Sequence, residues 1–292
     1  MEHAKVGIIY LTYNSFEELK ETIITSPVQN AVEFKYYVID NNSPKTDKIS
    51  MKEWCDKHDI VCILNNQNLG FAAGNNIAIE QAFNNNCTHV IVLNPDTIIH
   101  DNKFLKILLD EYGDHHGVLS ALEILDDNTV YSAGTNILPI ISMPLKRLRG
   151  INADTMADSL SDVDAVEGSC MFFDKYTWNS VGKIPESYFL YFEETDWCSK
   201  VARQNLPVRV TTKTKLVHNY SSSVGYISNV YLYYIIKNFP QFVISTQPWY
   251  YWPTSFLFYV LLWIPFHIYL CVKSLQFLKI KYILKGAFRL SF

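Results

Sequence analysis

The chain has 292 residues, 49% of them hydrophobic, which suffices for one large domain or one domain with an appendage. All 29 acidic residues lie at or before Asp196, whereas residues 197–292 hold 11 basic residues and no acidic one. A basic segment fits a polyanionic partner, but residues 238–272 carry no charge and are crowded with aromatic side chains, which favours a membrane surface and excludes a nucleic-acid groove.

Cysteine spacing and the start of the chain indicate the compartment. The six cysteines show neither close pairing nor the spacing of metal ligands, so we expect reduced thiols in a cytosolic protein rather than a disulfide framework. The chain begins Met-Glu-His-Ala-Lys and enters a predicted strand directly, so we expect no signal peptide.

Apolar runs and helical segments alternate in the first 115 residues. The predicted strands cover 5–11, 34–39, 60–64 and 90–93, and the predicted helices cover 16–26, 46–58, 70–84 and 101–115. Ser15 and Glu18 have the spacing of a capping box at the start of the first helix. This alternation predicts an α/β fold with a mostly parallel, twisted, Rossmann-like sheet flanked by helices.

The regular alternation of predicted strands and helices ends after residue 115. Further strands are predicted at 118–125, 129–132, 165–173, 208–211 and 216–217, with a helix at 193–204. Residues 138–162 are polar and contain a basic cluster, so we expect an irregular, mobile loop there.

The C-terminal part predicts a helical, membrane-associating appendage that is hydrophobic and basic. A helix is expected from 228 to about 240, and the 24 uncharged residues Trp249–Val272 would form a helix roughly 36 Å long, enough to span a bilayer. One crossing would put the basic tail across the membrane from a cytosolic domain, against the positive-inside tendency, so we favour helices lying in the cytoplasmic interface or a re-entrant hairpin. The alternatives are a subunit contact in a homo-oligomer or ordinary core helices.

Polar side chains follow the predicted parallel strands at the edge where ligands bind in such sheets. They are Asn14, Asp40 with Asn41, Asn68 and Asp96. Asp40 suits a base imide N–H or a ribose hydroxyl, and Asp96 suits a metal ion that carries a diphosphate. Each of them has the alternative role of an ordinary turn residue.

Two glycines, Gly70 and Gly74, open a predicted helix. Their lack of side chains would let backbone N–H groups approach a diphosphate. Their Gly-x-x-x-Gly spacing is not the dinucleotide fingerprint, which disfavours a nicotinamide enzyme.

Acidic side chains crowd the start of the predicted helix at 193–204. Glu193, Glu194 and Asp196 either compensate the helix dipole or, because like charges raise one another's pKa, supply a general base. His218 ends a strand and is either structural or, with Asp96, half of a site for Mn²⁺ or Mg²⁺.

The order and spacing of these segments resemble the inverting family-2 glycosyltransferases with a GT-A fold. The motifs that carry the resemblance are Thr12-Tyr13-Asn14, Asp40-Asn41-Asn42-Ser43, Asn68-Leu69-Gly70-Phe71-Ala72-Ala73-Gly74-Asn75, Leu93-Asn94-Pro95-Asp96-Thr97, Ser132-Ala133-Gly134, Gly168-Ser169, Tyr191-Phe192-Glu193-Glu194-Thr195-Asp196-Trp197-Cys198 and Val217-His218. The third motif is most similar to the rhamnosyltransferase-like branch, which also includes galactofuranosyl enzymes.

The resemblance implies a metal site and a donor site. Asp96 would be the last acid of the family's Asp-x-Asp motif, whose first acid is replaced here by Asn94, and His218 would be the second ligand of Mg²⁺ or Mn²⁺. The residues implied in donor binding are Thr12, Tyr13, Asn14, Asp40, Asn41, Asn68, Gly70, Ala73, Gly74, Asn75, Asn94 and Arg149. Arg149, with Lys146 and Arg147, would close over the diphosphate, although a solvated loop is the alternative.

The resemblance also implies the catalytic residues. Glu194 occupies the base position, where relatives more often carry Asp, and Glu193 is the alternative base. Asp196 would be a supporting or acceptor-side carboxylate.

The implied function is transfer of a sugar, with inversion, from a nucleotide-sugar donor to a polyprenyl-diphosphate-linked or polysaccharide acceptor at the cytoplasmic face of the cell membrane. The expected donor is dTDP-rhamnose, with UDP-galactose, UDP-galactofuranose or UDP-N-acetylglucosamine as alternatives. A rival from another class is a nucleotide-sugar-binding membrane scaffold without activity. The expected parts are a catalytic domain at 1–225 and a membrane-association region at 226–292.

Overall fold

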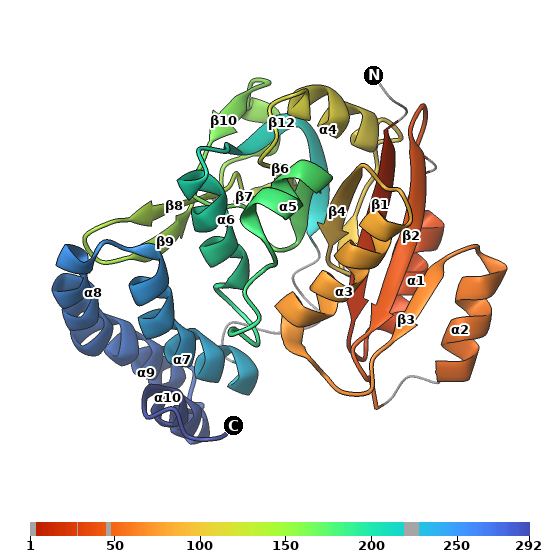
Figure 1. Ribbon diagram of the computed structural model, residues 1–292. Coiled ribbons are helices and arrows are strands. Elements are labelled where there is room, and N and C mark those ends of the chain that lie inside the picture. The colour runs from red at the N-terminus through yellow and green to blue at the C-terminus, as the bar shows by residue number, and fades with distance from the viewer. Residues whose placement is uncertain (1–3, 28, 45–47, 219–227) are drawn as a thin grey trace.

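A twisted, mostly parallel sheet forms the centre of the computed structural model, which describes residues 4–27, 29–44, 48–218 and 228–292 (Figure 1). Its strands are β1 (Lys5–Thr12), β2 (Glu33–Asp40), β3 (Val61–Leu64), β4 (His89–Leu93), β5 (Thr97–Ile98), β6 (Val118–Ile124), β7 (Val130–Ser132), β10 (Leu160–Asp162), β11 (Cys170–Asp174) and β12 (Val208–His218). They lie in the order β10-β12-β6-β11-β4-β1-β2-β3, with β5 beside β12 and β7 beside β6.

The directions of the strands determine which strand ends lie at the same edge of the central sheet. β11 runs antiparallel to both β4 and β6, while β12 is parallel to β6 and β1 is parallel to β2 and β4. The carboxyl ends of β1, β2, β4, β6 and β12 therefore lie at the same edge, together with the start of β11.

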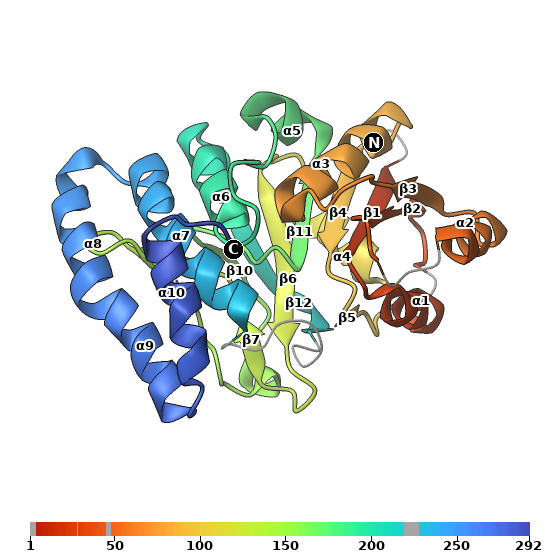
Figure 2. The ribbon, with the colours of Figure 1, turned by 90° about the horizontal axis from the view of Figure 1, so that it is seen from below.

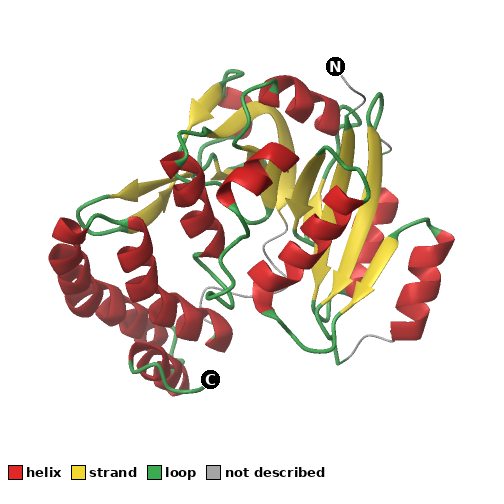
Figure 3. Cartoon of the chain, in the orientation of Figure 1, coloured by secondary structure: helices red, strands yellow, loops and turns green. Residues whose placement is uncertain are grey.

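Helices cover both faces of the sheet (Figures 1 and 3). One face packs on α3 (Gly70–Asn84), α5 (Lys175–Val181) and α6 (Glu193–Arg203), and the other packs on α1 (Phe16–Thr25), α2 (Lys48–Lys57) and α4 (Phe104–Tyr112). Alternate residues of the buried strands supply the two cores, as the period of two requires. The predicted α/β class and mostly parallel sheet are confirmed.

The expectation of an irregular loop at 138–162 is wrong. A hairpin of β8 (Thr135–Leu138) and β9 (Met143–Lys146) reaches out towards α8, and a short 3₁₀ turn at Ala153–Thr155 leads into the edge strand β10 (Figure 1). These strands are short and partly exposed, so they lack the apolar run that marks a buried strand.

Other boundaries also differ from the prediction. The two strands expected at 208–217 are one strand, β12, with an irregular register between Thr211 and Lys215. The predicted capping box is wrong, because the Ser15 hydroxyl lies 3.0 Å from Thr12 Oγ1 and makes no cap hydrogen bond. The helix α5 was not predicted, and β11 begins only at Cys170.

The C-terminal region is helical and gathers at one end of the molecule, opposite α2 (Figure 2). It consists of α7 (Asn229–Thr246), a 3₁₀ turn (Trp249–Tyr251), α8 (Trp252–Phe258), a π-helical turn (Tyr259–Trp263), α9 (Ile264–Lys273), a second 3₁₀ turn (Phe277–Lys279) and α10 (Ile280–Ala287). Within the described residues, one helix has the length and apolarity of a membrane span: Trp249–Lys273, 25 residues with a mean hydropathy of 1.9. The predicted long apolar helix is confirmed.

The first helix of this region continues past the predicted end near residue 240, because Pro240 lies inside α7. The packed face of α7 outweighs the loss of one backbone hydrogen bond at that proline. The expected domain boundary at 225–226 falls outside the described residues.

Candidate active site

Three buried polar side chains, from β6, from the end of β12 and from the turn between β4 and β5, meet at the carboxyl edge of the sheet. His218, at the end of β12, has Nε2 3.5 Å from Asp96 Oδ1 and Nδ1 3.2 Å from Glu123 Oε2. Ser169, just before β11, donates to the two carboxylate oxygens of Glu123 at 2.8 and 2.7 Å. The structure thus brings Asp96 and His218 together, as expected, and adds Glu123 behind the imidazole.

The imidazole of His218 offsets part of the negative charge of this cluster. Burial by itself lowers the pKa of His218, but hydrogen bonds to Asp96 and Glu123 outweigh that effect and raise the pKa to about 9. At neutral pH, without a bound cation, His218 is therefore protonated between the two carboxylates.

An unusual turn delivers the acidic residues of α6 to the same edge. Tyr191 and Phe192 both have left-handed backbone angles, with φ of 69° and 74°. Such angles cost about 1–3 kcal/mol each in a residue other than glycine, so the surroundings must hold them. Asn238 of α7 does so, because its amide donates to the carbonyl oxygens of Leu190 and Tyr191 at 2.8 and 3.2 Å, while Phe192 stacks on Phe242.

The three acids of the first turn of α6 have different surroundings. Glu193 is 3% exposed and its Oε2 has no hydrogen-bond partner, whereas Glu194 is only partly buried. Burial and the charge of Glu194 raise the pKa of Glu193 well above its usual range. Burial and the charge of Glu167 raise the pKa of Glu194 to about 7, the range in which a carboxylate can accept a proton at neutral pH.

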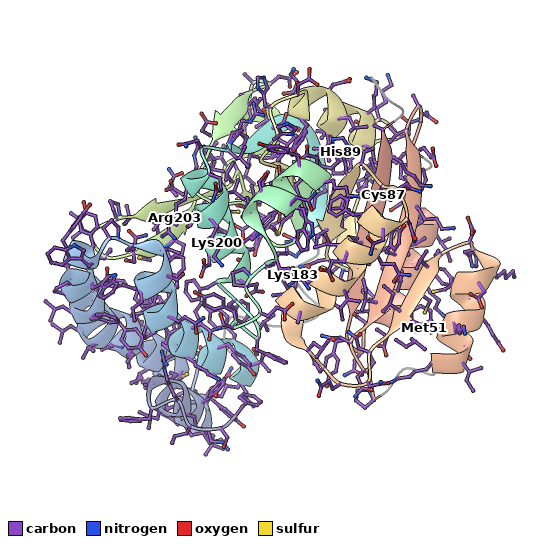
Figure 4. The ribbon with its side chains drawn as sticks, viewed as in Figure 1. Met51, Cys87, His89, Lys183, Lys200 and Arg203 are labelled. Atoms are coloured by element: carbon purple, nitrogen blue, oxygen red, sulfur yellow. The ribbon has the colours of Figure 1, made fainter. Side chains whose placement is uncertain are left out.

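Asp196 joins α6 to α7. Its Oδ2 accepts a 2.8 Å hydrogen bond from Tyr188 and another from Ser245, and it is 2% exposed. Arg203 lies at the other end of α6 (Figure 4). It donates to the carbonyl oxygens of Ser245 and Thr246 at 2.7 and 2.8 Å. Asp196 is thus buried between α6 and α7, and its role as a supporting or acceptor-side carboxylate stays a prediction.

A second buried carboxylate, Glu167, connects the hairpin to Glu194. It accepts hydrogen bonds from Ser132 and Thr135 at 3.0 and 2.9 Å. It also forms an ion pair with Lys146, with Nζ and Oε2 2.6 Å apart. Burial opposes its ionisation, but Lys146 and the hydroxyl donors lower the pKa of Glu167 overall, so it is charged. The adjacent Gly168 lies against Glu194, since a Cβ there would be 3.8 Å from Glu194 Cβ.

Tyr131 lies between the Lys146–Glu167 ion pair and His218. The Lys146 ammonium lies 3.6 Å from the centre of the Tyr131 ring. The same ring is nearly perpendicular to the His218 imidazole, with centroids 4.9 Å apart. Arg149 lies 5.5 Å from the same ring, so it too is near the site, while Arg147 donates to Asp162 O at 3.1 Å, away from it. Lys146 therefore belongs to β9, whereas Arg147 and Arg149 lie in the turn that follows this strand.

The predicted donor residues lie along the other half of the edge. Asp40, fully buried at the end of β2, accepts from the backbone N–H of Ser43 at 3.2 Å, and Ser43 Oγ accepts from the N–H of Asn14 at 2.8 Å. Asn14 has a φ of 61°, which its short polar side chain tolerates. Thr12 is buried at the end of β1, and Tyr13 next to it is 48% exposed.

Asn41 organises the loop before α3. Its amide donates to Asn68 Oδ1 at 2.8 Å and to Gly70 O at 3.0 Å, and its oxygen accepts from Leu69 N and Asn65 Nδ2 at 3.1 Å. This network accounts for Asn41 and Asn68 through local structure.

The glycines of α3 have packing roles. A Cβ at Gly70 (φ +81°) would lie 2.2 Å from the carbonyl oxygen of Phe189, and one at Gly74 would lie 2.6 Å from Leu11 Cδ1. Both glycines are thus accounted for without a bound diphosphate, and their contact with the donor stays a prediction. Asn75 is buried with its Oδ1 unpartnered, and Ala73, partly exposed, lies beside it.

Comparison with known proteins identifies the family. The model of the family described as glycosyl transferase family 2 matches residues 8–173. The chain belongs to this family. A curated relative, the low-salt glycan biosynthesis hexosyltransferase Agl10 of Haloferax volcanii, is 27% identical over 217 residues, which cover 73% of this chain and 67% of the relative.

Solved structures support the GT-A fold of this transferase. The mannosyltransferase PcManGT from Pyrobaculum calidifontis, solved with GDP-Man and Mn²⁺, superposes with a TM-score of 0.60 at 12% identity, covering 97% of this chain and 86% of that one. GalNAc-T7, solved with UDP, GalNAc and Mn²⁺, gives a TM-score of 0.61 at 11% identity over 82% of this chain. This chain spans about half of the length of GalNAc-T7, 49%.

The side chains present fit a divalent cation in this glycosyltransferase. Asp96 offers a carboxylate oxygen and His218 an imidazole nitrogen on the same side, and Glu123 holds the other ring nitrogen, the usual arrangement behind a metal-bound histidine. Among the described residues, no set of three His, Cys, Asp or Glu side chains forms a complete site. A cation there would need oxygens from a bound donor or water.

Glu123, Glu167, Tyr131 and Asn238 are site residues that the sequence did not predict. The sequence could have indicated two of them. Glu123 and Glu167 are carboxylates within apolar runs, and a charge is costly to bury there unless it has a partner.

Proposed function

We propose that this transferase moves a sugar from a nucleoside-diphosphate donor to a hydroxyl group of its acceptor with inversion at the anomeric carbon. The observation that carries the proposal is the partly exposed Glu194, whose pKa of about 7 suits proton transfer, at the same sheet edge as the Asp96–His218 pair. A single displacement needs a base for the acceptor and a positive centre for the leaving diphosphate.

In the proposed step, Glu194 takes the proton of the acceptor hydroxyl. The acceptor oxygen forms a bond to the anomeric carbon while the bond from that carbon to the diphosphate oxygen breaks. Asp96 and His218 would hold a Mg²⁺ or Mn²⁺ ion, which supplies positive charge for the leaving diphosphate. Glu193 is the less suitable base, because it is only 3% exposed, whereas Glu194 is partly exposed.

The donor proposed is dTDP-rhamnose, with UDP-galactose, UDP-galactofuranose and UDP-N-acetylglucosamine as alternatives. Asp40 would bind the nucleoside, since it lies at the carboxyl end of β2 where an imide N–H or a ribose hydroxyl can be bound. Arg149 would bind the diphosphate from the hairpin side. Agl10 supports a hexose, because it is described as a hexosyltransferase.

The acceptor proposed is a polyprenyl-diphosphate-linked saccharide or a growing polysaccharide at the cytoplasmic face of the membrane. The support is the apolar, basic C-terminal region at 226–292, which would bring the enzyme to a lipid-bound acceptor.

A donor screen tests the proposal. Each nucleotide sugar is incubated with Mg²⁺ or Mn²⁺, with and without lipid-linked acceptor, and released nucleoside diphosphate is measured. Glu194→Gln should lose acceptor-dependent turnover while it still binds nucleoside diphosphate, whereas Glu193→Gln, the matched control, should keep most of its turnover. If no donor is turned over by the wild-type enzyme, the protein is a nucleotide-sugar-binding scaffold instead.

A further inference from the structure

The long apolar helix Trp249–Lys273 keeps one face against the rest of the protein along its whole length. Every fourth residue is buried, and these residues are Ser255, Tyr259, Trp263, His267 and Cys271. In a regular α-helix, positions four apart turn by about 40° around the axis, so such a stripe would drift away from its partner. The wider π-helical turn at Tyr259–Trp263 offsets this drift, which keeps the stripe facing α7.

The buried stripe is held by specific contacts. Tyr259 donates to the carbonyl oxygen of Ile236 at 3.1 Å, and Phe239 of α7 stacks on both Tyr259 and Trp263, with centroids 5.6 and 5.4 Å apart. At the N-terminal end, Ser255 Oγ lies 2.7 Å from Ser142 Oγ of the hairpin β8–β9. The helix therefore belongs to the folded unit rather than standing free of it.

The opposite face is apolar and exposed. Large hydrophobic residues on this face, in the turns between α9 and α10, and on or just after α10 are between 43% and 84% exposed. We call them the outer surface: Leu257, Val260, Leu261, Leu262, Phe266, Tyr269, Val272, Leu275, Phe277, Leu278, Leu284, Phe288 and Leu290. Scattered apolar residues are normal on a protein surface, but this many exposed large hydrophobic residues within one C-terminal segment mark a site of interaction. Trp249 and Tyr250, also exposed, stand at its start, as aromatic residues do at a membrane–water boundary.

The positive charges around the outer surface indicate which kind of partner it binds. Lys273, Lys281 and Arg289 are exposed beside it, and residues 197–292 contain no acidic residue. A second copy of this surface would bring lysines and arginines against one another, which like charges disfavour. A bilayer leaflet with anionic headgroups satisfies both the apolar residues and the positive charges.

We infer that the outer surface docks flat on an anionic lipid leaflet, with the helix Trp249–Lys273 lying in the plane of the membrane and not crossing it. Crossing would place about 20 residues of this helix in hydrocarbon. The helix would then either carry α7 and the hairpin into the bilayer or break the contacts of Tyr259 and Trp263 with Phe239. The carbonyls and amides on the open edges of the two-stranded hairpin would be unpaired in hydrocarbon, which costs several kcal/mol for each group.

Vesicle flotation tests the docking face. The inference rests on the proposed function only for the choice of a lipid-bound acceptor, so donor hydrolysis is measured on the same proteins. Wild type should float with phosphatidylcholine vesicles that contain phosphatidylglycerol and much less with pure phosphatidylcholine. Leu261→Glu combined with Leu278→Glu should weaken binding about a hundredfold, since each leucine contributes about tenfold. The matched control, Ile24→Glu with Ile49→Glu, changes two exposed isoleucines on α1 and α2 and should float like wild type.

Protease access tests the orientation. A tag added after Phe292 should stay open to a protease outside the vesicles; protection of the tag would mean that the helix crosses and would overturn the inference. Equal flotation of the leucine and isoleucine variants, or self-association of the lipid-free protein that competes with vesicle binding, would also overturn it. If a variant no longer floats but still hydrolyses the donor, the proposed function stands. If the protein floats normally but does not hydrolyse any donor, the docking inference stands and the proposed function fails.

Discussion

The pH dependence of the transfer reaction should respond in opposite directions to the two members of the Lys146–Glu167 ion pair. The charge of Glu167 raises the pKa of Glu194, and the charge of Lys146 lowers it. Glu167→Gln should therefore move the acid limb of kcat/KM to lower pH, because Glu194 then ionises more easily. Lys146→Gln should move the same limb to higher pH.

The expected size follows from the packing of Gly168 on Glu194, which brings the neighbouring Glu167 into range. Two carboxylates roughly 7 Å apart repel by about 2 kcal/mol at an effective dielectric constant of about 20. Partial exposure of Glu194 screens this to about 1 kcal/mol, or somewhat less than one pH unit. Two other titratable groups lie beside Glu194: burial raises the pKa of Glu193 well above its usual range and raises the pKa of Cys198 to about 12.

The assay is kcat/KM for acceptor-dependent turnover as a function of pH, because this ratio reports the ionisation of the free enzyme. Thermal unfolding of both variants checks that the hairpin still folds. The electrostatic reasoning would be refuted if the acid limb moved in the same direction in both variants, or if kcat fell while the acid limb stayed in place. The ion pair would then have a role in folding alone.

Three further predictions concern the supports of the site. Glu123→Gln should raise the metal concentration for half-maximal turnover about 10–100-fold with little change at saturating metal, as measured by Mn²⁺ titration, because Glu123 orients His218. Gly70→Ala should lower the free energy of unfolding in urea by more than about 2 kcal/mol, since its Cβ would collide with a backbone carbonyl; Gly150→Ala, with a similar φ but open space around it, should cost only about 1 kcal/mol. Asn238→Ala should lower kcat about tenfold or more while KM for the donor changes little, because the turn before α6 loses its support.

The first half of the fold could be predicted because its signals are local. The strands β1 to β4 are apolar runs that end at, or just before, Thr, Asp or Asn, and a helix comes before the next strand of the parallel set. The parallel order and the shared carboxyl edge therefore follow from general rules. That edge is sufficient to bring Asp96 and His218 together, although 122 positions of the sequence separate them. No pattern within one segment was needed for this pairing.

The residues that were missed depend on contacts between distant segments. Glu123 and Glu167 lie in runs that predict strands well, and their partners His218 and Lys146 are known only once β12 lies beside β6 and the hairpin has folded. The course of α7 through Pro240 is likewise decided by packing, since local propensity predicts a stop there. Local signals therefore located the strand ends, whereas tertiary contacts determined which charges face one another.

The hairpin β8–β9 joins the two functional parts of the molecule. Near its tip, Ser142 bonds to Ser255 of the apolar helix, and at the end of β9, Lys146 bonds to Glu167 beside Glu194. On the other side of the site, Asn238 of α7 holds the turn before α6. Because these contacts are packed and hydrogen-bonded, the distance from the outer surface to Glu194 is set by the fold and not by the length of a linker. If the outer surface docks on a leaflet as proposed, only an acceptor whose hydroxyl lies at that height above the headgroups reaches the base, so the anchor itself selects among acceptors.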